Sequence, residues 1–391
     1  MSISSAYIHI PFCRRRCFYC DFPVTVLGDE GGKTYSKWQR EYVDFLCQEI
    51  IITVPKQSHP LNTVFFGGGT PSLLAIEGLE KILLTLEDNF FFAQNVEISM
   101  EIDPATFSLP QLQEYKKLGV NRISLGVQSF QDDLLKECGR SHLVKDIYQS
   151  VDYINKVGID NWSLDLISGL PHQTLNHWQE SVSRAIALQP KHLSCYDLVL
   201  ESGTVFGKKY QAGDNPLPPD ETTASMYCYA SNTLQEKGYH HYEISNYAQP
   251  NYQCQHNLVY WHNQQYYGFG MGAASNVHQQ RFTRPRTRQE YFKYVKELTQ
   301  NKGKIEHSLT DKQEELLETL MLGLRLKEGV SLSLIRDKFG EDRVKKILSC
   351  LQPHFQNDLI TFSQDRNKIT LTDPQGFLYS NSVLTSLFAA L

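Results

Sequence analysis

Thr63-Val-Phe-Phe-Gly-Gly-Gly-Thr-Pro-Ser72 is an apolar run that ends in three glycines, and an amphipathic pattern over 76–90 follows it. A short apolar run bounded by glycine and proline is typical of a buried strand. Strand, turn and helix in this order form a βα unit, because parallel neighbours need a crossover connection. The stretch therefore predicts an α/β fold.

The same alternation continues on both sides of this stretch, as far as about residue 200. Consecutive βα units wind right-handed, so a barrel or an open sheet is expected, with the functional site at the C-terminal ends of the strands. The predicted strands are 6–10, 63–66, 96–101, 122–127, 162–167 and 192–198, and the predicted helices between them are 36–53, 76–90, 109–118, 143–157 and 175–188.

The rest of the chain is organised differently. A helix is predicted over 220–237, an aromatic and histidine-rich stretch runs to Gly272, and the four arginines of Arg281–Arg288 predict a loop. From about residue 305, three helical patterns precede two short apolar runs, an order typical of a winged helix. This region is not notably basic, so we interpret 305–391 as a structural or interaction domain. Its predicted helices are 311–326, 331–339 and 341–351, and its predicted strands are 359–362 and 368–372.

The composition excludes several classes of protein. Of the 391 residues, 41% are hydrophobic and 21% charged, which is ordinary for a globular chain and excludes a fibrous or mainly disordered one. The net charge of −5 argues against non-specific nucleic-acid binding. No apolar run approaches the roughly 18 residues of a membrane span, and the start lacks the regions of a signal peptide. We expect a cytoplasmic protein, monomeric or homodimeric, with transient membrane-protein contact left open.

Three of the nine cysteines lie within eight residues, in Cys13-Arg-Arg-Arg-Cys17-Phe-Tyr-Cys20, directly after the first predicted strand. Thiolates bind zinc or iron–sulfur clusters. A structural zinc site needs four ligands, usually in two separated pairs, whereas only three thiols are present here. A four-iron cluster normally takes four thiolates, so three leave one iron open for another ligand. The spacing therefore predicts a reactive 4Fe-4S cluster on Cys13, Cys17 and Cys20, with a zinc module as the weaker alternative.

The glycine loop adds a second signal. Consecutive glycines let the backbone approach a ligand and direct its N–H groups at it, although a tight βα turn is the simpler explanation of a lone triplet. Together, the cysteine and glycine motifs resemble those of the radical S-adenosylmethionine (SAM) family. In that family the open iron binds the amino and carboxyl groups of SAM, and an electron from the cluster cleaves SAM to a deoxyadenosyl radical. The resemblance implies that Gly68, Gly69 and Thr70 hold the methionyl amino group.

Further motifs, spread over nearly the whole chain, resemble the oxygen-independent coproporphyrinogen III oxidase group. They are Tyr7–Cys13, Glu101–Pro104, Gly126–Phe130, Gly139–His142, Asp165–Pro171 and His256–Trp261. This resemblance implies a partial parallel (β/α)6 barrel over 1–300, with the cluster loop at 13–20, followed by a small winged-helix-like domain over 305–391. It also implies that SAM is bound by Tyr7, Tyr19, Gly68, Gly69, Thr70, Glu101, Gln128, Arg140, Asp165, Val199 and Ala274.

Two departures from the oxidases are similar to the HemW branch of haem chaperones. Phe22 stands where the oxidases carry a fourth cysteine, and only twelve residues precede Cys13. Members of that branch bind haem and pass it to acceptor proteins, retaining the cluster and SAM. The resemblance implies a haem-associated segment over 240–275, with His256 as the haem residue, because a neutral imidazole suits haem iron. The alternative for His256 is a hydrogen-bonded core histidine.

Three functions remain open from the sequence. The first is a haem chaperone with haem and a haem-accepting protein as partners. The second is radical decarboxylation of coproporphyrinogen III propionates to vinyl groups, an activity that we expect to be absent because of Phe22. The third is a radical SAM enzyme with an unrelated substrate.

Overall fold

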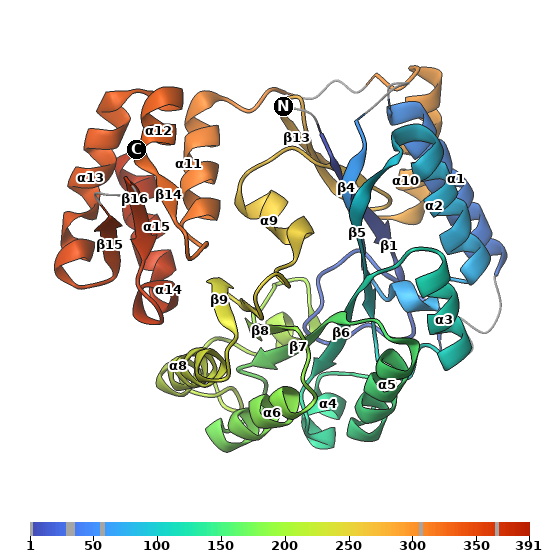
Figure 1. Cartoon of the computed structure of the whole chain (residues 1–391), viewed down its shortest axis with the longest axis horizontal. Helices are drawn as coiled ribbons and strands as arrows, with labels where there is room; N and C mark the ends of the chain where they lie inside the picture. The colour runs from blue at the N-terminus through green and yellow to red at the C-terminus, as the bar shows by residue number, and fades with distance from the viewer. Residues whose placement is uncertain (1–2, 29–35, 55–58, 305–307, 364–366) are drawn as a thin grey trace.

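Nine strands form one curved sheet in the order β11-β1-β4-β5-β6-β7-β8-β10-β9, shown in the computed structural model of Figure 1. The run from β11 to β8 is parallel, whereas β10 and β9 pair antiparallel at one end. The six predicted strands are confirmed as β1 (Ser5–Ile10), β4 (Leu61–Gly68), β5 (Phe92–Ile102), β6 (Arg122–Gln128), β7 (Asn161–Ser168) and β8 (His192–Asp197). The sequence missed β9 (His240–Glu243), β10 (Asn246–Ala248) and β11 (Tyr267–Phe269). The partial parallel barrel is therefore confirmed, with three short strands added to it.

The structure describes residues 3–28, 36–54, 59–304, 308–363 and 367–391. The predicted domain boundary at residue 305 lies outside them. Among the described helices, none has the length and apolar character needed to cross a membrane.

Helices cover the convex face of the sheet, and a short helix occupies its concave side (Figure 1). In α5, the buried side chains Ile147, Val151 and Ile154 recur at helical spacing and pack on the sheet. All the predicted convex-side helices are confirmed, as α1 (Lys37–Thr53), α2 (Ile76–Phe90), α3 (Leu109–Lys117), α5 (Val144–Val157), α6 (Leu175–Ala187) and α8 (Asp220–Glu236). The concave side holds α9 (Gln255–Trp261).

The prediction of a loop over 281–288 was wrong at both ends. Strand β13 (Gln280–Thr283) pairs with β12 (Ala274–Val277), and α10 (Arg288–Gln300) begins at the last arginine. Between them, Nε of Arg284 lies 2.7 Å from Oε1 of Glu49 on α1, and both side chains are fully buried. A buried carboxylate partner allows an arginine-rich segment to lie inside the molecule.

The C-terminal part has its own hydrophobic core, which includes Leu320, Ile347 and Leu384. The predicted winged-helix order is confirmed, and two helices follow it. The elements are α11 (Lys312–Gly323), β14 (Val330–Ser331), α12 (Leu332–Phe339), α13 (Glu341–Gln356), β15 (Ile360–Ser363), β16 (Lys368–Leu371), α14 (Gln375–Leu378) and α15 (Ser380–Ala390).

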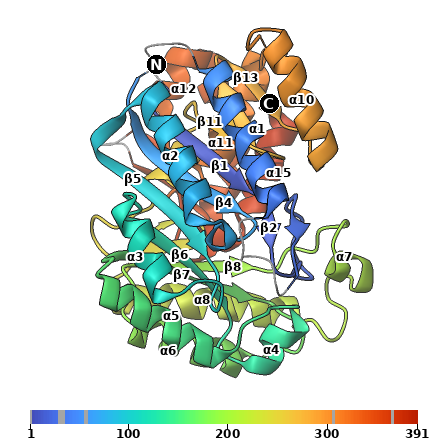
Figure 2. The ribbon, with the colours of Figure 1, turned by 90° about the vertical axis from the view of Figure 1, so that its right-hand side faces the viewer.

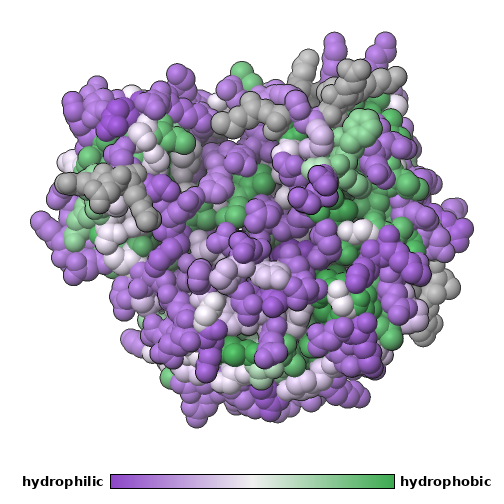
Figure 3. Space-filling view, viewed as in Figure 1, coloured by the Kyte–Doolittle hydropathy of each residue, from purple (hydrophilic) through white to green (hydrophobic). Residues whose placement is uncertain are grey.

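The face seen in Figure 3 is mainly hydrophilic, with hydrophobic side chains in small separate areas.

Candidate functional site

The cysteine loop follows β1 and is fixed at several points. It starts at β2 (Phe12–Cys13), which pairs with β3 (Thr25–Val26), and the N–H of Leu27 donates to the carbonyl of Cys13 at 2.8 Å. In the middle of the loop, the N–H of Phe18 donates to the carbonyl of Cys138 at 3.0 Å. The short helix α7 (Val205–Lys209) lies on the same side of the molecule (Figure 2). The loop is thus held at both ends and at its centre.

The three thiols of this loop have different surroundings. Cys13 is buried, and burial together with the nearby Asp103 raises its pKa to about 12, against the effect of the Thr70 hydroxyl. Nη1 of Arg140 lies 3.4 Å from Sγ of Cys17, and Cys20 is partly exposed. In the described chain, no three histidine, cysteine, aspartate or glutamate side chains converge on a single metal ion. Three soft ligands on one loop, next to a guanidinium, fit a larger cluster of several irons.

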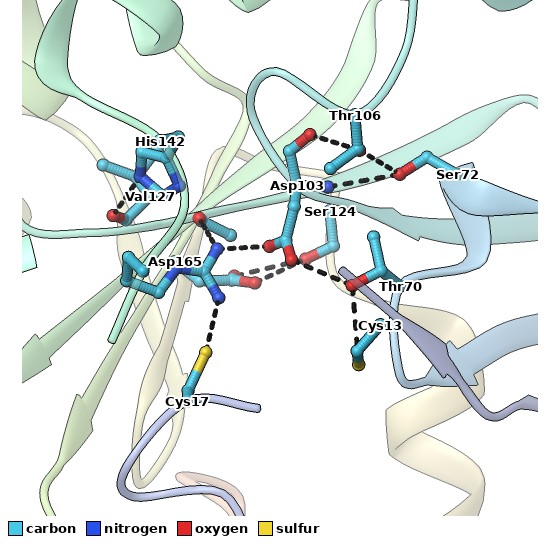
Figure 4. A network of polar contacts seen from close by, with 12 residues as sticks. Cys13, Cys17, Thr70, Ser72, Asp103, Thr106, Ser124, Val127, His142 and Asp165 are labelled. Atoms are coloured by element: carbon cyan, nitrogen blue, oxygen red, sulfur yellow. Dashed lines mark hydrogen bonds and ion pairs between the residues drawn. The ribbon is translucent and has the colours of Figure 1, made fainter. Parts of the chain in front are cut away.

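A network of polar contacts connects the cysteine loop to the strand ends (Figure 4). Asp103, directly after β5, pairs with Nη2 of Arg140 and accepts a hydrogen bond from the Thr70 hydroxyl at 3.0 Å. The same Nη2 donates to the carbonyl of Gly126 at 2.7 Å. Asp103 therefore joins the glycine loop to Arg140. The sequence missed it, although it lies in the quoted motif Glu101–Pro104.

Two glycines make this arrangement sterically feasible. A Cβ on Gly126 would lie 2.5 Å from Oδ1 of Asp103, so only glycine leaves space for the ion pair. Gly68 has φ +108°, and a Cβ there would lie 2.3 Å from the ring of His9. The N–H of Gly68 donates to Oε2 of Glu101 at 3.0 Å. Both glycines are therefore required by close approach of side chains.

Two buried carboxyl groups, those of Glu101 and Asp165, line the same cavity at this end of the barrel. Burial, with the charges of Asp165 and Asp103, raises the pKa of Glu101 to about 8, against the effect of the Gly68 N–H. Burial also raises the pKa of Asp165, whose carboxylate accepts a hydrogen bond from the Ser124 hydroxyl at 3.0 Å. Glu101 is therefore protonated in a neutral solution without ligand, and a cationic group beside it would favour its charged form.

These residues line a cavity of about 230 Å³ inside the barrel. Tyr7, Gly68, Glu101 and Asp165, which the resemblance assigns to SAM binding, contribute to it. The cavity is also lined by Phe22 and by Asn257 and Tyr260 of the motif His256–Trp261. The further lining residues, which the sequence did not single out as a site, are Phe65, Arg122, Ser124, His192, Ser194 and Tyr196. For the lining residues on β6 and β8, the signal lies in the alternation of these strands, where polar residues occupy every second position.

The remaining predicted SAM residues lie around this cavity or farther out. Tyr19 is beside Cys17 and Arg140, whose charges act on it. Gln128 has φ +69°, and its buried Oε1 has no hydrogen-bond partner among the described residues. Ala274 packs against Gly268, the register partner of Tyr7. Val199 lies just beyond β8 and is 62% exposed.

His256 is fully buried at the start of α9, and both of its ring nitrogens have partners. Nδ1 lies 2.8 Å from the Thr63 hydroxyl, and Nε2 lies 2.8 Å from the Tyr260 hydroxyl. Burial, with the charge of Arg122, lowers the pKa of His256 to about 3, so the ring is neutral. As the structure stands, His256 has the surroundings of a core histidine. Its neighbours Asn257 and Tyr260 reach the cavity instead.

The chain is similar to known proteins in sequence and in fold. Residues 7–185 match the Radical SAM superfamily, and residues 310–373 match the HemN C-terminal domain. The chain is 48% identical to the heme chaperone HemW of Synechocystis sp., over 99% of this chain and 97% of that protein. It is 37% identical to the heme chaperone HemW of Bacillus subtilis over the full length of both. Among solved structures, coproporphyrinogen III oxidase (HemN) from Escherichia coli has the same fold, with a TM-score of 0.83 and 23% identity over 100% of this chain and 91% of that one.

Proposed function

This chain belongs to the family of radical SAM proteins named heme chaperone HemW, and on that basis we propose that it binds haem and passes it to an acceptor protein. The observation that carries the proposal is the cavity shared by two groups of residues. Tyr7, Glu101 and Asp165 line it from the strands, and Tyr260 lines it from α9. A group bound at the strand ends and a ligand bound against α9 would therefore be neighbours.

The donor set of the site supports a 4Fe-4S cluster on Cys13, Cys17 and Cys20. Bound there, the cluster would supply one-electron transfer to SAM. The guanidinium of Arg140, beside Cys17 and paired with Asp103, would offset the negative charge of the thiolates and hold this end of the site in position.

SAM would take the polar groups that face the mouth of the cavity. Glu101 is suited to the methionyl amino group, and Asp165 to ribose hydroxyls. The free Oε1 of Gln128 is an acceptor in need of a donor. The further members of this proposed set are Tyr7, Tyr19, Gly68, Gly69, Thr70, Arg140, Val199 and Ala274.

Haem would bind against α9, in the segment 240–275. For His256 to become an iron ligand, iron must replace the Tyr260 hydroxyl at Nε2. We further propose a cytoplasmic location, a monomeric or homodimeric state, and a division into 1–300 and 305–391. In this division, the second part serves as a structural or interaction domain that a haem acceptor could contact.

An anaerobic experiment tests the proposal. The cluster is reconstituted, haem is titrated into the protein by absorbance, and the loaded protein is mixed with an apo-haem protein to measure transfer. Saturable haem binding followed by transfer is expected. In a parallel reaction, SAM, a reductant and coproporphyrinogen III are added. Decarboxylated product from the cluster-loaded protein would support the oxidase alternative and overturn the chaperone.

A further inference from the structure

The deep end of the cavity carries a buried cation. Arg122 lies on β6 two residues before Ser124, so both point to the same face of the sheet. In the strand register Arg122 pairs with Ser99 and Ser124 with Glu101, which places Arg122 one layer deeper than the carboxyl groups at the mouth. Its side chain is 2% exposed and lines the cavity, and its Nε has no hydrogen-bond partner among the described residues.

The carboxylates that act on Arg122 are engaged with other groups. Glu97 accepts hydrogen bonds from the N–H groups of Gln255 and His256, both at 3.1 Å, in the first turn of α9. Asp165 accepts from the Ser124 hydroxyl at 3.0 Å. A buried guanidinium whose nitrogen lacks an acceptor costs free energy. Such a group persists where a ligand supplies the missing acceptor.

A second buried nitrogen that lacks a partner among the described residues lies on His192. Nε2 of His192 is 2.8 Å from the Tyr242 hydroxyl, and that hydroxyl already accepts the N–H of Cys254 at 3.3 Å. When the Tyr242 hydroxyl donates to Nε2, the ring proton of neutral His192 sits on Nδ1. Burial and the charge of Arg122 lower the pKa of His192 well below its usual value, which keeps the ring neutral. Nδ1 has no partner among the residues that the structure describes, and His192 lines the cavity.

We propose that Arg122 and His192 form a carboxylate-binding subsite at the floor of this cavity, and that its ligand is one propionate of the bound tetrapyrrole. The proposal rests on the proposed haem-binding function and adds the group by which the ligand is held. The aromatic side chains of Phe65, Tyr196 and Tyr260 line the same cavity and suit an apolar macrocycle edge. A volume of about 230 Å³ accommodates a propionate arm and the adjoining edge, with the rest of the macrocycle against α9.

The test compares iron(III) protoporphyrin IX with its dimethyl ester, in which both carboxylates are neutral. Both are titrated into the full-length, cluster-loaded protein in the same detergent solution. Hydrogen bonds to a charged group predict about tenfold or more tighter binding of the free acid. Equal affinities for the two porphyrins would overturn the subsite and leave haem binding intact. Failure of both to bind would overturn the proposed function, and the subsite with it.

Two variants locate the effect. Arg122→Gln is expected to lose the preference for the free acid by lowering affinity for it, with affinity for the ester unchanged. Arg122→Lys, which keeps the charge, is expected to retain part of the preference. Because the carboxylate comparison is also made in the unaltered protein, poor folding of a variant leaves the test decisive. A preference that survives undiminished in a folded Arg122→Gln protein would contradict the assignment.

Discussion

The Tyr260 hydroxyl lies 2.8 Å from Nε2 of His256, one turn earlier on the same helix. This hydrogen bond occupies the nitrogen that a haem iron would need. Replacing Tyr260 by phenylalanine keeps the ring and removes the competitor.

If His256 binds the iron, Tyr260→Phe should therefore increase haem affinity by about fivefold, the typical net contribution of one hydrogen bond. His256→Ala should lower haem affinity and change the haem absorption spectrum. Tyr266→Phe is the matched control, because Tyr266 packs on Tyr260 without bonding His256. Unchanged titrations in both the Tyr260 and His256 variants would leave His256 a core histidine.

Cys17→Ser should abolish the cluster and leave the fold largely intact, since Cys17 lies on a loop outside the hydrophobic core. Iron and sulfide content after reconstitution measures the loss of the cluster, and circular dichroism measures whether the fold is retained. Cys228→Ser serves as control, because Cys228 is partly exposed and remote in sequence from the loop. Full iron loading of Cys17→Ser would remove this thiol from the ligand set.

Gly126→Ala should lower SAM affinity more than tenfold while the cluster still assembles. The new Cβ would lie 2.5 Å from Oδ1 of Asp103 and must displace the Asp103–Arg140 pair. At the exposed Gly203, a Cβ would meet Asp21 at 3.0 Å, where a flexible side chain can move, so Gly203→Ala should bind SAM normally. Calorimetric titration of both variants measures the difference. Normal SAM binding by Gly126→Ala would show that the network does not shape this site.

Glu101 makes a pH-dependent contribution to stability. Its pKa is about 8 in the folded protein and about 4.5 when exposed. Between these values the unfolded chain releases a proton that the folded protein retains, so this contribution is full below pH 4.5 and is lost as pH rises through 8. Glu101→Gln should consequently gain stability relative to the wild type as pH increases across this window. Unfolding temperatures measured from pH 5 to pH 8.5 test the sign. If the unfolding temperatures of Glu101→Gln and wild type changed in parallel with pH, the contribution assigned to Glu101 would be contradicted.

Breaking the buried pair of Arg284 and Glu49 should be strongly destabilising. Removing one partner from a buried ion pair leaves an uncompensated charge, so Arg284→Met should cost about 3–5 kcal/mol in the free energy of unfolding. Arg286 pairs with Asp21 at 2.9 Å, but both side chains are about half exposed, so Arg286→Met should cost about 1 kcal/mol or less. Denaturant unfolding of the two variants measures both losses in the free energy of unfolding. Similar losses would mean that burial does not distinguish these arginines.

The sequence predicted the elements whose patterns are long and regular. The six parallel strands and the helices between them follow from apolar runs and helical spacing, and the thiol and glycine motifs lie where the strand ends meet. Strands β9 to β13 were missed because they have three or four residues each, rich in tyrosine, histidine and polar groups. Their places are fixed by partners distant in the chain, as Arg284 is by Glu49.

The sequence also did not predict which side chains line the inside of the barrel. Arg122, Ser124, His192 and Ser194 carry no motif, and their importance arises only when neighbouring strands align in register. His256 was singled out because its motif resembles a haem-associated one. A single sequence cannot reveal that Thr63 and Tyr260 occupy both nitrogens of its ring.

The sheet is not closed into a ring, since among the described strands β11 and β9 stand at its two ends. In a closed barrel, a continuous ring of hydrogen bonds fixes the circumference. Here the width of the cavity depends instead on α9, a seven-residue helix that lies on the concave face. Its residue His256 forms hydrogen bonds with Thr63 and Glu97 of the sheet. A shift of this one short helix would therefore widen the cavity without separating any pair of strands.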